Sequence, residues 1–148
     1  MSILAWWMRI VGALYVFLFV AATFLRLPIQ TEGPEGLLEK AAAGDPMAKF
    51  VVDTWVVLGL ELGVIGAALV IAARVPAKAT ILVWTVIGGE LIWGIGSDVY
   101  KLARGYEPVV PSIWIFIHAL IIVTGFLGLR RVTSAVGATS DIWQEEIS

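Results

Sequence analysis

The stretch that decides the fold is residues 79–101, ATILVWTVIGGELIWGIGSDVYK, which is apolar in its first half and polar towards its end. Its length suits an α-helix that crosses a membrane, since about 20 predominantly apolar residues span the hydrocarbon core of a bilayer. Glu90 stands near its middle, although a charged side chain there costs about 2.5–3.5 kcal/mol on insertion scales. Such residues almost always face a bundle interior or a water-filled cavity. The stretch therefore predicts a membrane helix with a polar inner face.

Three further apolar runs indicate that the whole chain is a multi-pass membrane protein. Of its 148 residues, 59% are hydrophobic, and its mean hydropathy is +0.92, whereas a soluble domain is about 45–50% apolar. We therefore predict an all-α fold, with a four-transmembrane-helix bundle in residues 1–131 and a polar C-terminal tail in residues 132–148. The predicted spans are residues 4–25, 50–73, 79–101 and 112–129.

The connections between the predicted spans fit an antiparallel bundle. The link ARVPAK between the second and third spans allows only a tight turn, so these spans are predicted to form a hairpin. Pro108 and Pro111 end the third span and begin the fourth. The first connection is the longest, and within it EGLLEKAAA predicts one or two turns of helix. Tryptophans near the span ends indicate an aromatic belt at the membrane interface: Trp6, Trp7, Trp84 and Trp114.

The composition excludes several classes of function. The chain has no cysteine, which removes disulfides, thiolate metal sites and CxxC redox chemistry. Its net charge of −2 provides no basic field, so we expect no nucleic-acid partner. No nucleophile–base pair is visible, and GGELIWGIG is a packing sequence within a helix rather than a phosphate-binding loop. An enzyme is therefore not favoured, and no cofactor is predicted.

Carboxylates fall in two layers on the predicted hairpin. Glu61 and Glu90 lie near the middles of the second and third spans, at similar depth because these spans are antiparallel. Asp53 and Asp98 each lie eight residues farther from the tight turn, which is about 12 Å along a helix. His118, on the fourth span, falls between the two layers. We predict an intramembrane polar site of Glu61, Glu90 and His118, and ion pairs at its outer mouth among Arg26, Asp53, Asp98 and Lys101.

The third span carries the clearest polar stripe, and three interpretations of the polar site stay open. Glu90, Gly94, Ser97 and Lys101 recur at helical spacing, with Asp98 on the flank of the stripe. Carboxylates and an imidazole suit a divalent metal such as Zn, Mn or Fe, although no dedicated metal motif is present. Two carboxylates at one depth in a low dielectric are expected to share a proton, which favours a proton-linked role. Alternatively, the acids pair with neighbouring cations and only fix the register of the helices.

A seam of small residues marks the second span. Gly59, Gly63 and Gly66 lie along one side of the helix and include a GxxxG motif, which allows membrane helices to pack closely. Glu61 points to roughly the opposite side. If Glu61 faces the bundle interior, the seam faces outward, towards a membrane-protein partner or a second copy in a homo-oligomer. The alternative is that the seam packs against the first span.

The basic residues near the span ends give the orientation only weakly. The side with both termini and the tight turn carries five of them, and the opposite side also carries five. The opposite side, however, also holds most of the carboxylates of the connections. Since cytoplasmic loops are enriched in Lys and Arg, we predict that both termini are cytoplasmic.

Four blocks of the sequence carry a family resemblance: GDPMAKFVVDTW, GLELGVIG, ELIWGIGSDVYKLARGYEP and WIFIHALIIVTG. Together with the WWMR start, they resemble the BphX-like family of small bacterial four-span membrane proteins. The resemblance covers most of residues 6–131. It implies a fold and a place in the bacterial cytoplasmic membrane rather than an activity, since the biochemical function of this family is uncharacterised.

The function that we expect is that of a small, non-enzymatic membrane protein. It would be an accessory subunit of a larger membrane complex, or would bind a hydrophobic small molecule or lipid between its helices. The small size, the glycine seam and the lack of a catalytic motif favour this interpretation. The alternative is a proton- or metal-linked, transport-type function that uses the intramembrane carboxylates and the histidine.

Overall fold

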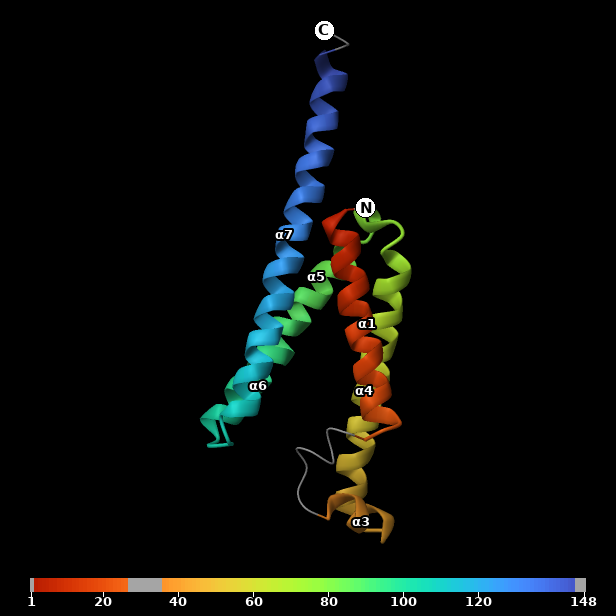
Figure 1. The fold of residues 1–148 in the computed structure, drawn as a ribbon, viewed down its shortest axis with the longest axis vertical. Coiled ribbons are helices and arrows are strands. Elements are labelled where there is room, and N and C mark those ends of the chain that lie inside the picture. The colour runs from red at the N-terminus through yellow and green to blue at the C-terminus, as the bar shows by residue number, and fades with distance from the viewer. Residues whose placement is uncertain (1, 27–35, 146–148) are drawn as a thin grey trace. The chain divides into compact units, whose positions relative to one another are not determined.

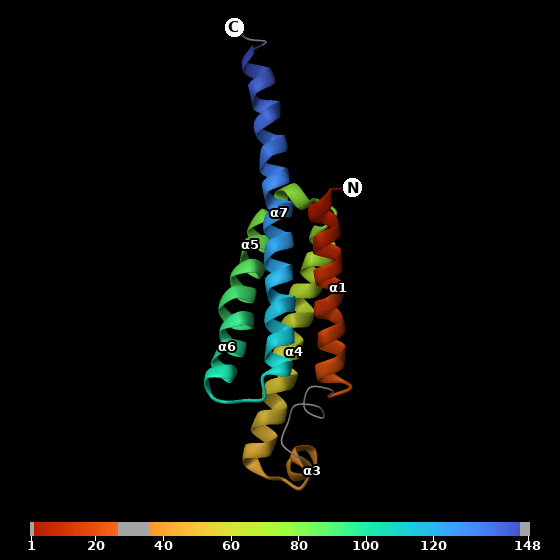
Figure 2. The same ribbon diagram turned by 60° about the vertical axis from the view of Figure 1, so that its left-hand side comes forward.

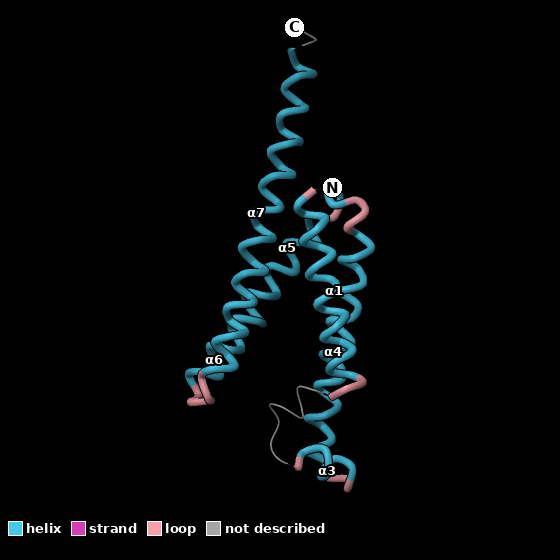
Figure 3. Tube along the Cα trace, viewed as in Figure 1, coloured by secondary structure: helices cyan, strands magenta, loops and turns pink. Residues whose placement is uncertain are grey.

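The computed structural model describes residues 2–26 and 36–145, with side chains up to Val132. Every regular element in this part of the chain is helical (Figure 3). The elements in chain order (Figure 1) are α1 (Ile3–Thr23), α3 (Leu37–Ala42), α4 (Pro46–Ala72), η1 (Pro76–Lys78), α5 (Thr80–Gly89), the π-helix η2 (Glu90–Ile95), α6 (Gly96–Ala103) and α7 (Val109–Glu145).

Four apolar helical segments are long enough to cross a membrane. They are Ile3–Thr23, Pro46–Ala72, Thr80–Ala103 and Val109–Val132. The third of these combines α5, η2 and α6, which follow one another without a break. The predicted all-α fold with four candidate membrane helices is therefore confirmed.

The observed helices begin and end a few residues away from the predicted spans. α4 starts at Pro46 because Asp45 caps it: the Ala48 N–H donates to Asp45 Oδ1 at 2.8 Å. α7 begins at Val109 and contains Pro111 in its first turn, where proline is tolerated. The same helix continues to Glu145, through most of the stretch that the sequence assigns to a polar tail.

A tight cap ends α6 and returns the chain to α7. Gly105 has a φ of +80°, in the left-handed region that glycine adopts without steric penalty. Its N–H donates to the Leu102 carbonyl at 3.0 Å, and the Tyr106 N–H donates to the Lys101 carbonyl at 3.2 Å. These bonds satisfy two of the last carbonyls of α6, and α7 begins a few residues later.

The helices form two compact units. Arg9–Ile71 make up the N-terminal unit, and Met1–Met8 with Ala72–Ser148 make up the C-terminal unit. In the N-terminal unit, α1 and α4 lie side by side (Figures 1 and 2). At the start of α4, Ala48 and Val52 bury the side chain of Leu37 from α3. This small apolar cluster attaches α3 to α4.

In the C-terminal unit, the third span lies beside α7 (Figures 1 and 2). The first residues of α1 belong to the same unit and pack on α7. Leu4 is fully buried against Gly128, and the buried Trp7 donates from Nε1 to the Ile121 carbonyl at 3.0 Å. Trp7 is therefore a packing residue rather than a member of the expected exposed belt, whereas Trp6 and Trp84 are exposed.

Candidate functional site

Four polar side chains gather where the third span meets α7. Glu90 begins η2, Asp98 and Lys101 lie on α6, and His118 lies on α7. His118 Nδ1 pairs with Glu90 Oε2, and His118 Nε2 lies 3.6 Å from Asp98 Oδ2. Lys101 Nζ donates to Asp98 Oδ1 at 2.8 Å. We call this series, Glu90–His118–Asp98–Lys101, the polar chain.

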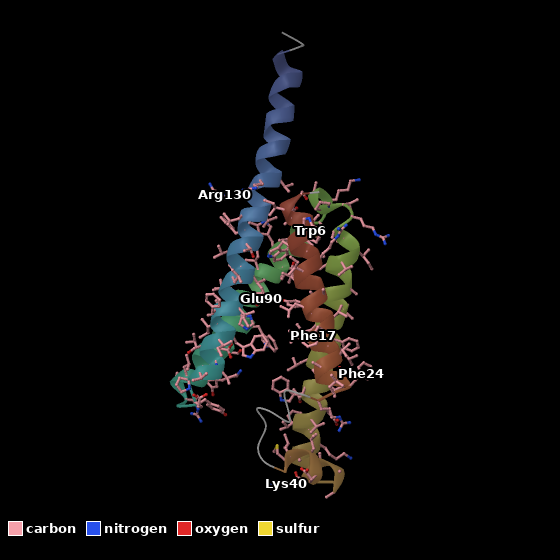
Figure 4. All side chains as sticks on the ribbon, in the orientation of Figure 1. Trp6, Phe17, Phe24, Lys40, Glu90 and Arg130 are labelled. Carbon is pink, nitrogen blue, oxygen red and sulfur yellow. The ribbon has the colours of Figure 1, made fainter. Side chains whose placement is uncertain are left out.

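The polar chain runs from a buried end to an exposed end. Glu90 and Asp98 are only 5% and 2% exposed, whereas the Lys101 side chain is 37% exposed. Glu90, which Figure 4 labels, begins η2 between α5 and α6. This part of the third span lies beside α7. Ionisable groups inside membrane helices pair with one another because hydrocarbon cannot solvate them. The polar chain therefore connects a deep carboxyl group to an ammonium group near the end of the span.

The π-helix determines which side chains of the third span face α7. In a regular α-helix, residues eight apart differ in direction by about 80°, since each residue turns the chain by about 100°. A π-helix bonds i to i+5 and so fits more residues into a turn. Glu90, Gly94 and Asp98 are consequently all buried, at a spacing of four residues.

Regular helical spacing predicts Ser97 on the polar stripe and Asp98 on its flank, and the structure corrects this. Asp98 is buried beside His118, while the Ser97 hydroxyl is half-buried and donates to the Gly94 carbonyl at 3.0 Å. The error comes from assuming a regular helix through η2. The one sign of η2 in the sequence is the concentration of glycines in GGELIWGIG, which is also typical of close helix packing.

Gly94 gives the imidazole of His118 its space. A Cβ atom at Gly94 would lie 2.6 Å from His118 Nδ1, closer than real side chains approach. On α7, one turn before His118, the ring of Trp114 lies 5.9 Å from the imidazole, centroid to centroid. Gly94 and Trp114 thus confine the imidazole to the position in which both of its nitrogens face carboxylates.

Glu61, unlike the other two predicted site residues, Glu90 and His118, lies in the N-terminal unit. It is exposed in the middle of α4, in the N-terminal unit. The structure brings Glu90 and His118 together as predicted, but the second carboxylate on His118 is Asp98. All four members of the polar chain belong to the C-terminal unit.

The four residues predicted at the outer mouth divide between the two units. Asp98 and Lys101 form an ion pair that is part of the polar chain. Arg26 and Asp53 belong to the N-terminal unit and are exposed. Neither of them forms an ion pair with another residue in the described part of the chain. Arg26 lies three residues after the end of α1 and has a φ of 52°.

The glycine seam of α4 packs against α1. A Cβ atom at Gly59 would lie 2.8 Å from Thr23 Oγ1, and one at Gly63 would lie 2.8 Å from Phe19 Cγ. At Gly66 the nearest atom is the carbonyl oxygen of Gly12, at 2.7 Å. The seam therefore makes the close helix contact inside the N-terminal unit, which is the second of the two alternatives that the sequence leaves open.

The polar chain does not have the donor arrangement of a metal site. Within residues 2–26 and 36–132, no group of three or more His, Asp or Glu side chains converges on a position for a metal ion. His118 has its two nitrogens directed at two different carboxylates, one of which is also paired with Lys101. The arrangement is a linear series of polar groups, in which His118 Nε2 and Asp98 Oδ2 are 3.6 Å apart.

Comparison with known proteins relates the chain to one family. Residues 1–134 match the family model described as BphX-like. An uncharacterised BphX-like protein from Burkholderia cepacia is 28% identical over 128 residues, which is 84% of this chain and 88% of the relative. The uncharacterised BphX-like protein Bxeno_C1129 from Paraburkholderia xenovorans (strain LB400) has the same identity and coverage. No solved structure matches the chain.

Proposed function

We propose that this chain, which belongs to the BphX-like family, is a multi-pass membrane protein that moves protons along its polar chain. The observation that carries the proposal is His118, whose two ring nitrogens face two carboxylates on the neighbouring span. An imidazole can accept a proton at one nitrogen while it donates a proton from the other. Placed between two carboxyl groups, it can pass a proton from one to the other.

The chemistry follows from the order of the groups. A proton on the Asp98 carboxyl passes to His118 Nε2, and the proton on His118 Nδ1 passes to Glu90. The imidazole is neutral before and after these two transfers, because it gains one proton and loses one. Lys101 compensates the negative charge of Asp98 once the proton has left. These two transfers move one proton from Asp98 to the buried Glu90. Before the next proton can follow, Glu90 must release this one towards the opposite side and the imidazole must return its remaining proton from Nε2 to Nδ1.

A purely structural role for the polar chain would need fewer groups. The pair of Glu90 and His118 alone would fix the third span against α7, and Asp98 with Lys101 alone would form an ion pair on one helix. The position of His118 beside both carboxylates joins the two pairs into one series. This continuity supports proton movement over a simple lock between two helices.

The role of accessory subunit or ligand-binding protein has less support. A glycine seam that faces outward would favour such a role. The seam packs instead against α1 within the N-terminal unit. The exposed apolar side chains along the helices are those that lipid covers in any multi-pass protein. We therefore retain the proton-linked function as the conclusion.

The proposed location is the bacterial cytoplasmic membrane, with both termini in the cytoplasm. With four spans, this orientation would put η1 on the same side as the termini and the Lys101 end of the polar chain on the outer side. The proton would accordingly move from the outer side towards the middle of the membrane.

The experiment is proton uptake by vesicles that contain the purified protein. Potassium-loaded vesicles of phosphatidylcholine and phosphatidylglycerol, with an internal pH dye, receive valinomycin so that potassium efflux drives proton entry. We expect uptake with the wild type and a decrease of about tenfold or more with Glu90→Gln, because a group that carries the proton is lost. Glu39→Gln, an exposed position on α3, is the control. Equal uptake in all three proteins and in empty vesicles would exclude the proposal.

A further inference from the structure

Residues 88–96 of the third span contain four glycines, at positions 88, 89, 94 and 96. Gly94 is required by the imidazole of His118, as described above. The other three are not required by packing. A Cβ atom at Gly88 or Gly89 would meet no neighbouring atom within 4 Å, and one at Gly96 would meet only the Leu91 carbonyl oxygen, at 3.9 Å.

Within residues 2–26 and 36–132, each of the remaining glycines has a local reason. Those inside other helices would place a Cβ atom 3.0 Å or less from a neighbour, as at Gly12, Gly125 and Gly128. Gly36, Gly44 and Gly105 have positive φ angles, which disfavour other residues. Gly88, Gly89 and Gly96 therefore stand apart, because alanine fits at each of them and would favour a regular helix.

These glycines flank the π-helix. Gly88 and Gly89 end α5 immediately before η2, and Gly96 follows it. A π-helical turn is rarely stable by itself and is usually maintained by its surroundings. Glycine has no Cβ atom and changes its φ and ψ angles more easily than alanine, so these positions let the backbone on both sides of η2 adjust when the turn changes.

The two conformations would place Asp98 differently. In the π conformation, Glu90 and Asp98 both face His118. In a regular α-helix, the direction of Asp98 would differ from that of Glu90 by about 80°, so Asp98 would turn away from the imidazole. The contact between His118 Nε2 and Asp98 Oδ2, at 3.6 Å, is already longer than a hydrogen bond. It is the contact that a change in η2 would make or break.

We propose that residues 88–96 are a conformational gate, in which η2 changes between π and α conformations and so opens and closes the His118–Asp98 contact. The purpose of this gate rests on the proposed proton movement. The conformation of η2 can be measured separately from that movement. In the π conformation, His118 lies between the two carboxylates, with Nε2 at 3.6 Å from Asp98 Oδ2. In the α conformation Glu90 remains paired with His118, while Asp98 and Lys101 are disconnected from them.

The single histidine of the chain provides a direct measurement. In protein labelled with ¹⁵N-histidine, the Nδ1 and Nε2 signals report the partners of His118 without interference from another residue. The double variant Gly88→Ala/Gly89→Ala should favour the α conformation. We expect its Nε2 signal to move to the position found in Asp98→Asn, its Nδ1 signal to stay, and proton uptake to fall about tenfold.

Thr85→Ala is the matched control, since Thr85 is exposed on α5 and its hydroxyl donates to the Ile81 carbonyl on the same helix. It increases helix propensity one turn before the gate and should leave both ¹⁵N signals unchanged. Gly96→Ala tests the other side of η2 and should reproduce the Nε2 change. An unchanged Nε2 signal in both glycine variants would overturn the gate. A shifted Nε2 signal in a protein whose wild type takes up no protons would support the gate and remove the proton function.

Discussion

Glu90 and His118 are 28 residues apart in sequence, yet Glu90 Oε2 and His118 Nδ1 pair in the C-terminal unit and join the third span to α7. Leucine at either position would leave the other buried polar group without this partner, which costs about 1–3 kcal/mol. The variant with leucine at both positions should lose less stability than the sum of the losses in the two single variants. We expect this non-additivity in the free energy of unfolding, measured by SDS titration. Glu39→Leu on α3 is the control, and strictly additive single changes would contradict the pairing.

Gly94→Ala should displace His118, because the new Cβ atom would lie 2.6 Å from Nδ1. Forcing a methyl group into a packed interior typically costs about 1–3 kcal/mol. We predict lower stability and a changed Nδ1 signal in ¹⁵N-histidine spectra. Thr85→Ala is the control, since Thr85 is exposed on α5 and lies outside the contact with His118. Equal stability of the two variants would show that the imidazole does not lie against Gly94.

Gly66→Ala should separate α1 from α4, since the Cβ atom would lie 2.7 Å from the Gly12 carbonyl oxygen. A backbone atom cannot move aside as a flexible side chain can, so we expect a loss of about 1–3 kcal/mol. Analytical ultracentrifugation in detergent should show the same oligomeric state as the wild type. A changed oligomeric state with unchanged stability would instead place the seam between two copies of the chain.

Trp7→Phe should remove the hydrogen bond from the indole Nε1 to the Ile121 carbonyl, which measures 3.0 Å. A buried hydrogen bond contributes about 1 kcal/mol, and the Ile121 carbonyl would lose this donor. Trp6→Phe is a matched control at a neighbouring, exposed position. We predict a larger loss of stability for Trp7→Phe than for Trp6→Phe. The reverse order would contradict the packing of α1 on α7.

The orientation can be tested with single cysteines, because the chain has none of its own. Ala103→Cys lies at the end of α6, and Ser2→Cys lies just before α1. With both termini in the cytoplasm, a membrane-impermeant maleimide should label Ala103→Cys in intact cells and Ser2→Cys only after permeabilisation. The opposite labelling pattern would invert the topology and the direction of the polar chain.

The spans were predictable because apolar length is a property of the sequence alone, and Thr80–Ala103 agrees with residues 79–101. A polar site that includes Glu90 and His118 was also predicted, since buried ionisable groups in membrane helices pair with one another. The partner of the other imidazole nitrogen, Asp98, was not predicted. A constant turn of about 100° per residue directs Asp98 to the flank, and η2 departs from that turn.

Glu61 shows a second limit of the sequence. Its depth resembles that of Glu90, but depth on a helix does not determine which element a side chain faces. The glycine seam decides that question, because Gly59, Gly63 and Gly66 turn their side of α4 to α1 and leave Glu61 exposed on another side. We therefore expect Glu61→Gln to leave both ¹⁵N signals of His118 unchanged.

The most direct test of the proton-moving polar chain compares the initial rate of valinomycin-driven proton uptake by vesicles containing the wild type or His118→Gln. His118 is the group that faces both carboxylates, so its replacement should lower the rate about tenfold or more. Equal amounts of reconstituted protein in both samples make the rates comparable. A His118→Gln protein that takes up protons as fast as the wild type would contradict the proposal.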